Sequence, residues 1–161
     1  MSAFDKVPSG LPGMDKLLDY IRIGDNVVWQ VTNLDEFLYF ARTFAAQSIA
    51  DGRNLIYMRF ASHKPLLEPQ PGLKIYEFDP DKGFEAFTVD IYDRITKEGK
   101  EAFYIFDSLS SLQSVWYTDL MMGNFFRVTC PYLFRLDTVA YFPILRGRHS
   151  FDALAKIRDT P

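Results

Sequence analysis

Short apolar runs alternate along this chain with longer segments of helical periodicity, and this alternation constrains the fold most. Residues 26–31, 55–61, 73–78, 102–106 and 138–145 have the length and apolar content of buried strands. Apolar residues recur at helical spacing over 14–21, 34–50, 84–97 and 150–158, and a helical region interrupted near Pro131 is expected within 117–136. Pro143 is expected to make the last strand irregular. The alternation predicts a three-layer α/β/α sandwich with a mostly parallel central sheet.

The length and charge of the chain exclude several classes of protein. Its 161 residues, 48% of them hydrophobic, predict a single domain over 1–161. Its 18 Lys and Arg against 21 Asp and Glu, without a long run of one sign, argue against nucleic acid as a partner. No apolar run reaches the roughly 20 residues that span a bilayer, and the polar start is unlike a signal peptide. We therefore expect a cytoplasmic protein that does not bind membranes.

Two segments resemble landmarks of the RecA/KaiC-like P-loop ATPase superfamily. The segment PSGLPGMDKLL (8–18) resembles the opening that precedes the phosphate-binding strand of these ATPases. The segment FYIFDSLSSL (103–112) resembles their Walker B strand, with Asp107 in the place of the metal-associated carboxylate. Each motif is weak alone, but together with the order of elements between them the resemblance covers nearly the whole chain. It implies a RecA-like fold.

The phosphate-binding loop of that superfamily is absent. A working site needs a G-x-x-x-x-G-K-[ST] loop between the first strand and the next helix, because its backbone N–H groups and lysine bind the phosphates. Residues 31–38 read VTNLDEFL, without Gly or Lys. Asn33 and Glu36 instead have the spacing of a capping box, and Asp35 adds a second carboxylate to the first turn. This helix start is expected to repel phosphate, although an ordinary well-capped helix explains it equally well.

The hydrolytic residues are also missing. Related ATPases carry two glutamates after the Phe that ends the second strand, whereas here Phe60 is followed by Ala61 and Ser62. Neither replacement can act as a general base at neutral pH. Asp107 alone could contribute to a Mg²⁺ site through water, but a structural carboxylate bonded to nearby backbone or to Ser108 is the favoured interpretation. No catalytic residue is therefore assigned.

Basic residues follow two predicted strands at the edge of the sheet where α/β proteins bind ligands. Arg59 and His63 lie at the end of one strand and just after it, and Arg146 and Arg148 follow another. With Asp107 they form the candidate nucleotide- or anion-binding set, and the alternative is ordinary solvated surface charge. His63 and His149 have no partner at metal-ligand spacing, so no metal site is expected. Cys130 lacks an adjacent Asp or His and is not expected to be a catalytic thiol.

Aromatic residues are dense in the C-terminal half of the chain. They allow a large aromatic core, the favoured reading, or a partner surface whose candidates are Trp116, Tyr117, Phe125 and Phe126. The stretch 116–151 resembles a more specialised group of KaiC-like domains, found ahead of phosphoenolpyruvate synthase or pyruvate phosphate dikinase type modules in bacterial proteins. Because such domains usually continue into another strand, the resemblance implies that the chain stops short at its C-terminal end.

These observations predict a non-catalytic module, a pseudo-ATPase that regulates, senses or assembles. No cofactor is expected, since ATP with Mg²⁺ is disfavoured, and the expected partners are a protein, a linked downstream domain or further copies of the chain. The alternative is a nucleotide- or phosphometabolite-binding domain with weak or no hydrolysis. The two differ in whether the four basic residues converge on a pocket. An unrelated enzyme on the same fold stays open, because fold does not determine function.

Overall fold

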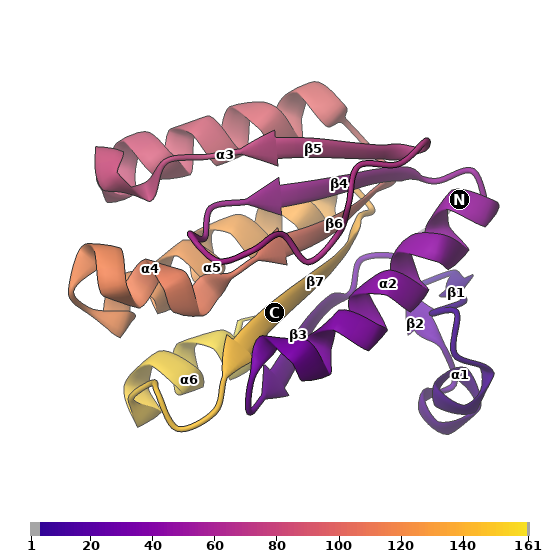
Figure 1. Ribbon diagram of the computed structural model, residues 1–161, viewed down its shortest axis with the longest axis horizontal. Coiled ribbons are helices and arrows are strands. Elements are labelled where there is room, and N and C mark those ends of the chain that lie inside the picture. Colours follow the sequence, from indigo (N-terminus) through magenta and orange to yellow (C-terminus); the bar gives the residue numbers. More distant parts are fainter. Residues whose placement is uncertain (1–3, 161) are drawn as a thin grey trace.

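A five-stranded, all-parallel sheet lies at the centre of the computed structural model, which describes residues 4–160. The strand order is β3-β7-β6-β4-β5, and the arrowheads in Figure 1 all point toward one edge of the sheet. The strands are β3 (Asn26–Val31), β4 (Asn54–Arg59), β5 (Leu73–Glu77), β6 (Ala102–Asp107) and β7 (Val139–Leu145). Because all five run in the same direction, the residues that follow them gather at this carboxyl edge.

Helices cover both faces of the sheet, which confirms the predicted three-layer sandwich. One face packs against α2 (Leu34–Ala50) together with an N-terminal unit of β1 (Lys6–Val7), α1 (Pro12–Leu18) and β2 (Ile21–Arg22). The other face packs against α3 (Phe84–Glu98), α4 (Leu109–Trp116), α5 (Asp119–Arg135) and α6 (Phe151–Arg158). A short 3₁₀ turn, η1 (Pro80–Lys82), lies between β5 and α3. Figure 1 shows α2 and α5 on opposite sides of the strands.

Alternate residues of each strand enter the two apolar layers. In β6, Phe103 and Ile105 face the α2 side, whereas Tyr104 and Phe106 face the side of α3 to α6. Rings stack within both layers: the centroids of Phe44 and Tyr141 are 4.0 Å apart, and those of Phe106 and Phe142 are 4.6 Å apart. The buried rings favour the aromatic-core interpretation of the composition.

The segment 8–18 that resembles the superfamily opening packs against α2. Gly10 has a φ of 87°, and a Cβ on it would lie 2.6 Å from the backbone oxygen of Thr43. Asp15 is buried and accepts a hydrogen bond of 3.0 Å from the backbone N–H of Ser9. The glycine therefore permits a close approach between this segment and the helix, and the aspartate holds the turn before α1.

Two helical predictions need correction. The first helix ends at Leu18, and Ile21 belongs to β2. The helix α4 over 109–116 was not predicted, and α5 runs through Pro131 without interruption. The proline is tolerated because the carbonyl it leaves without a donor belongs to Arg127, which lies on the exposed side of the helix where water can bind.

Pro143 does not break β7, contrary to the expected irregularity. Ala140 donates to Asp25 on the β3 side, so the alternation of a strand turns the nitrogen of Pro143 toward β6. Pairing between β6 and β7 ends at Ile105 and Tyr141, two residues earlier. The missing N–H of the proline therefore costs the sheet no hydrogen bond.

Candidate functional site

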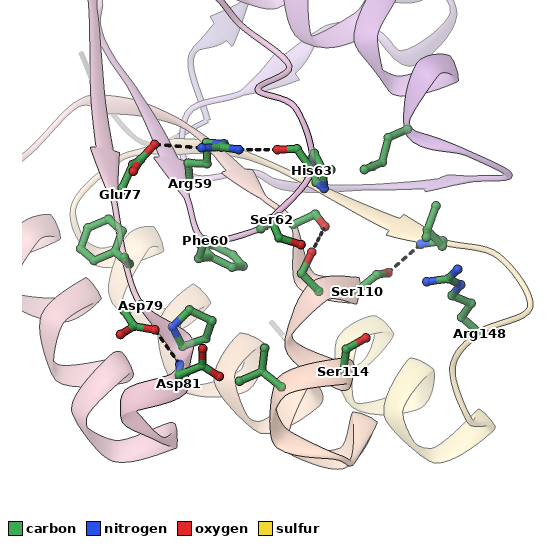
Figure 2. Close-up of a pocket in the computed structure, with 18 residues that line it drawn as sticks. Arg59, Phe60, Ser62, His63, Glu77, Asp79, Asp81, Ser110, Ser114 and Arg148 are labelled. Atoms are coloured by element: carbon green, nitrogen blue, oxygen red, sulfur yellow. Dashed lines mark hydrogen bonds and ion pairs between the residues drawn. The ribbon is translucent and has the colours of Figure 1, made fainter.

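A cavity of about 480 Å³ opens at the carboxyl edge of the sheet. Its walls come from residues at or just after the carboxyl ends of β4, β5, β6 and β7, together with Leu34 at the start of α2. Its size lies within the range of small-molecule sites, and its place is the one that parallel α/β sheets use for ligands. The cavity is shown in Figure 2, and its polar lining consists of Arg59, Ser62, His63, Glu77, Asp79, Asp81, Ser108, Ser110, Ser111, Ser114 and Arg148.

Asp107 precedes Ser108 of the cavity lining, does not itself line the cavity and is completely buried. The hydroxyl of Tyr57 donates a short hydrogen bond to its Oδ2 and accepts one of 3.0 Å from the backbone N–H of Leu66. Burial, and then the negative charge of Asp107, raise the pKa of Tyr57 well above its ordinary value. His63 Nε2 lies 2.8 Å from Oδ1 of Asp107, at an angle outside the range of a hydrogen bond. Oδ2 of the carboxylate is therefore bonded to Tyr57, whereas Oδ1 lies against His63 without a hydrogen bond.

The positive charge of Arg59 is paired with groups of the protein itself. Its guanidinium donates to Glu77 Oε1 at 2.8 Å and to the backbone oxygen of His63. The arginine side chain is only 16% exposed, so these bonds hold it in place between β4 and β5. Arg59 therefore fixes the loop that carries His63, and its positive charge is largely balanced by Glu77.

The two arginines after β7 lie in different places. Arg148 lines the cavity, and among residues 4–160 its guanidinium forms no hydrogen bond or ion pair. Arg146 does not line the cavity, because its Nε donates to the backbone oxygen of Gln30 at 3.1 Å. The predicted set therefore converges only in part: Arg59, His63 and Arg148 share the cavity, whereas Arg146 lies outside it.

The start of α2 has the predicted cap. Oδ1 of Asn33 accepts from the backbone N–H of Glu36 at 3.2 Å, and Glu36 Oε2 accepts from the backbone N–H of Thr32 at 2.9 Å. The glutamate therefore reaches back one residue further than the capping box would place it. These side chains occupy donors that a phosphate-binding loop would offer to its ligand.

Three acidic residues line the cavity and were missed by the sequence analysis. Glu77 ends β5, and Asp79 and Asp81 flank the start of η1. Oδ1 of Asp79 accepts from the backbone N–H of Asp81 at 2.9 Å, whereas the carboxylate of Asp81 forms no hydrogen bond or ion pair among residues 4–160. Their position at and after the end of a parallel strand is the sequence signal that points to them.

A second group that the sequence analysis missed links α4 to the end of β7. Oγ of Ser110 lies 2.7 Å from His149 Nε2 and accepts a hydrogen bond of 2.8 Å from the backbone N–H of Leu145. Burial lowers the pKa of His149, against the opposing effect of Asp119. Ser108 and Ser111 bond to each other through their hydroxyls at 3.0 Å. The peptide bond between Asp107 and Ser108 is cis. The hydrogen bonds of Ser108, Ser110 and Ser111 hold these serines in the wall of the cavity.

Two of the four aromatic residues predicted to form a partner surface are buried, which corrects that prediction. Phe125 is fully buried and Phe126 is 3% exposed, because both lie on the face of α5 that packs against the sheet. Trp116 packs edge-on against Phe87, and its indole N–H donates to the backbone oxygen of Pro80 at 3.0 Å. Tyr117, at 94% exposure, is the only one of the four predicted residues with a ring available to a partner.

Three further features are the cysteine, the metal-ligating side chains and the apolar content of the helices. Cys130 is buried, and burial raises the pKa of its thiol well above the ordinary value. Within residues 4–160 no group of three or more His, Cys, Asp or Glu side chains is arranged to hold a metal ion. None of the helices described there is long and apolar enough to cross a membrane.

Comparisons with known proteins leave the family open. No family model matches the sequence, and no curated protein matches it significantly. The relation to RecA/KaiC-like ATPases therefore rests on the two sequence motifs and stays a prediction.

Proposed function

We propose that this chain is a non-catalytic RecA/KaiC-like module, a pseudo-ATPase with a regulatory, sensing or assembly role. The engagement of Asp107 supports this most directly. The one carboxylate that remains of the hydrolytic set is fully buried, accepts from Tyr57 and lies against His63. A carboxylate that holds Mg²⁺ through water needs access to solvent or to the bound ion.

The start of α2 supports the same proposal. Asp35 and Glu36 lie in its first turn, where each carboxylate interacts favourably with the helix by about 0.3–1 kcal/mol. A bound triphosphate would have to displace Glu36 from the backbone of Thr32 and then lie beside like charge. The first turn of α2 therefore disfavours the binding of a phosphate group.

A sensing or assembly role is consistent with the remaining surface. The cavity is a place for a small ligand, and Tyr117 lies beyond the end of α4, which forms one wall of that cavity. The proposed partners are a protein, a linked downstream domain or another copy of the chain. The resemblance to KaiC-like domains ahead of phosphoenolpyruvate synthase or pyruvate phosphate dikinase type modules favours the linked domain.

The alternative function, binding of a nucleotide or phosphometabolite, is favoured by one observation: Arg59, His63 and Arg148 line the same cavity. Against it, that cavity also contains three carboxylates, which outnumber its two arginines. Arg59 is moreover paired with Glu77, which leaves Arg148 as the available arginine. A phosphate there would gain one strong cation and meet an acidic opposite wall.

Titration with ATP–Mg²⁺ and ADP, followed as a change in melting temperature, tests the proposal. A ligand that binds only the folded state raises its stability by mass action, so binding must be visible at millimolar nucleotide. We expect no change for the wild type. An increase that disappears in Arg148→Ala or Asp107→Asn would refute the proposal and favour the nucleotide-binding alternative.

A further inference from the structure

The cavity at the carboxyl edge contains two unpaired charges of opposite sign. Within residues 4–160, neither the carboxylate of Asp81 nor the guanidinium of Arg148 forms a hydrogen bond or ion pair. Figure 2 shows Asp79 and Asp81 at one end of the cavity and Arg148 at the other. The two ends are therefore complementary to different groups of one ligand rather than to each other.

The other charges of the cavity do not disturb this separation. Arg59 and Glu77 pair with each other at 2.8 Å, so together they offer little net charge. His63 turns its Nε2 toward Asp107, 2.8 Å away. An anion would be attracted by Arg148 but repelled by the acidic end, and a cation would be attracted by the acidic end but repelled by Arg148.

The middle of the cavity is polar but carries no net charge. Ser110 and Ser114 lie between the two ends in Figure 2, and Val115 of the same helix also lines the cavity. Ser110 is occupied by Leu145 and His149, whereas the exposed hydroxyl of Ser114 is available to contact a ligand. The volume of about 480 Å³ fits a small molecule and not a folded partner.

We propose that this cavity binds a small zwitterion, a molecule with a cationic group at one end and a carboxylate or another anionic group at the other. The cationic end contacts Asp81 and Asp79, and the anionic end contacts Arg148, whose planar donors suit a carboxylate. This inference deepens the proposed sensing role and rests on it, because it names the class of ligand that the module would sense. Both charges are exposed to solvent, so the affinity is modest.

The test uses ω-amino acids of two lengths, γ-aminobutyrate and ε-aminocaproate, with caproate and hexylamine as single-charge controls. Amide resonances of the full chain are followed by ¹H–¹⁵N NMR up to tens of millimolar probe. We expect saturable changes around 79–81, 110–115 and 148 with one of the two zwitterions, and much weaker changes with caproate or hexylamine. Two lengths are needed because the distance between the two ends selects one of them.

Variants distinguish recognition from non-specific effects. Arg148→Ala and Asp81→Asn should each weaken binding about three- to tenfold, because each removes one partially solvated ionic contact. Arg146→Ala is the matched control, since this arginine is in the same loop but lies outside the cavity. It should leave the affinity unchanged. Both Asp81 and Arg148 are exposed, so their replacement should not prevent folding.

The outcome separates this inference from the proposed function. No saturable change with either zwitterion, or equal binding by the single-charge controls, would overturn the inference. The same would follow from binding that is unaffected by both cavity variants. Nucleotide binding is measured on the same sample: if ATP–Mg²⁺ binds, the proposed pseudo-ATPase function fails, whether or not the zwitterion binds.

Discussion

Replacing Tyr57 with Phe tests whether Asp107 is held within the protein. The substitution keeps the ring, which is fully buried in the layer beside α2, and removes only the hydroxyl. Asp107 Oδ2 then loses its donor, and the backbone N–H of Leu66 loses its acceptor. Losing a hydrogen bond to a charged group costs about 1.5–3 kcal/mol, and leaving a buried amide unpaired costs about 1–3 kcal/mol. Because the two losses overlap, we expect a decrease of about 2–4 kcal/mol in the free energy of unfolding.

Urea denaturation followed by circular dichroism measures this decrease. An unchanged dependence of the unfolding free energy on urea would show that the native state stays compact. Tyr76→Phe is the matched control: the Tyr76 hydroxyl also donates to a carboxylate, Glu98, at 2.8 Å, but it is only partly buried. Glu98 keeps Lys74 and Asn54 as partners, so this variant should lose about 1 kcal/mol or less. A Tyr57→Phe variant within about 0.5 kcal/mol of the wild type would refute the reasoning.

Three further predictions follow from burial and backbone geometry. Phe125→Ala should lower the free energy of unfolding by about 3–5 kcal/mol, and Tyr117→Ala by less than about 0.5 kcal/mol. If chemical denaturation gave similar losses for the two variants, the assignment of Phe125 to the core and of Tyr117 to the surface would be wrong. Burial lowers the pKa of His149, so below pH about 6.5 the unfolded state binds more protons than the folded state. The free energy of unfolding should therefore decrease as the pH falls below this value, and it should decrease less in a His149→Gln variant. Gly10→Ala should destabilise the protein by more than about 1 kcal/mol in the same denaturation assay, through its positive φ and contact with Thr43; no loss would contradict that contact.

Most of the fold follows from local patterns in the sequence. The helix α2 begins and ends where apolar periodicity and the Asn33 cap predict, and β3 spans the predicted residues 26–31. The elements that were missed are short. The strands β1 and β2 have only two residues each, and α4 has eight, beginning at Leu109 after Ser108 in a serine-rich segment typical of turns and caps.

The candidate site was predictable only in part, because side-chain partners are set by tertiary contacts. The rule that ligand-binding residues follow parallel strands correctly placed Arg59, His63 and Arg148 together. It cannot distinguish Arg148 from Arg146, since the difference is a hydrogen bond to Gln30 on a neighbouring strand. The burial of Phe125 depends in the same way on which face of α5 meets the sheet.

The pairing of Tyr57 with Asp107 was also beyond the sequence analysis. The two residues are 50 positions apart and meet because β4 and β6 are neighbours in the sheet, with Tyr57 opposite Ile105. The periodicity of each strand indicates which residues are buried but not which strands adjoin.

The most direct measurement of the central claim is phosphate release from ATP–Mg²⁺ by the purified chain, compared with a buffer blank and with Asp107→Asn. We expect that the wild type and the variant both release phosphate no faster than the blank. Release by the wild type that is lost in Asp107→Asn would contradict it, because the carboxylate now assigned to Tyr57 and His63 would then serve hydrolysis.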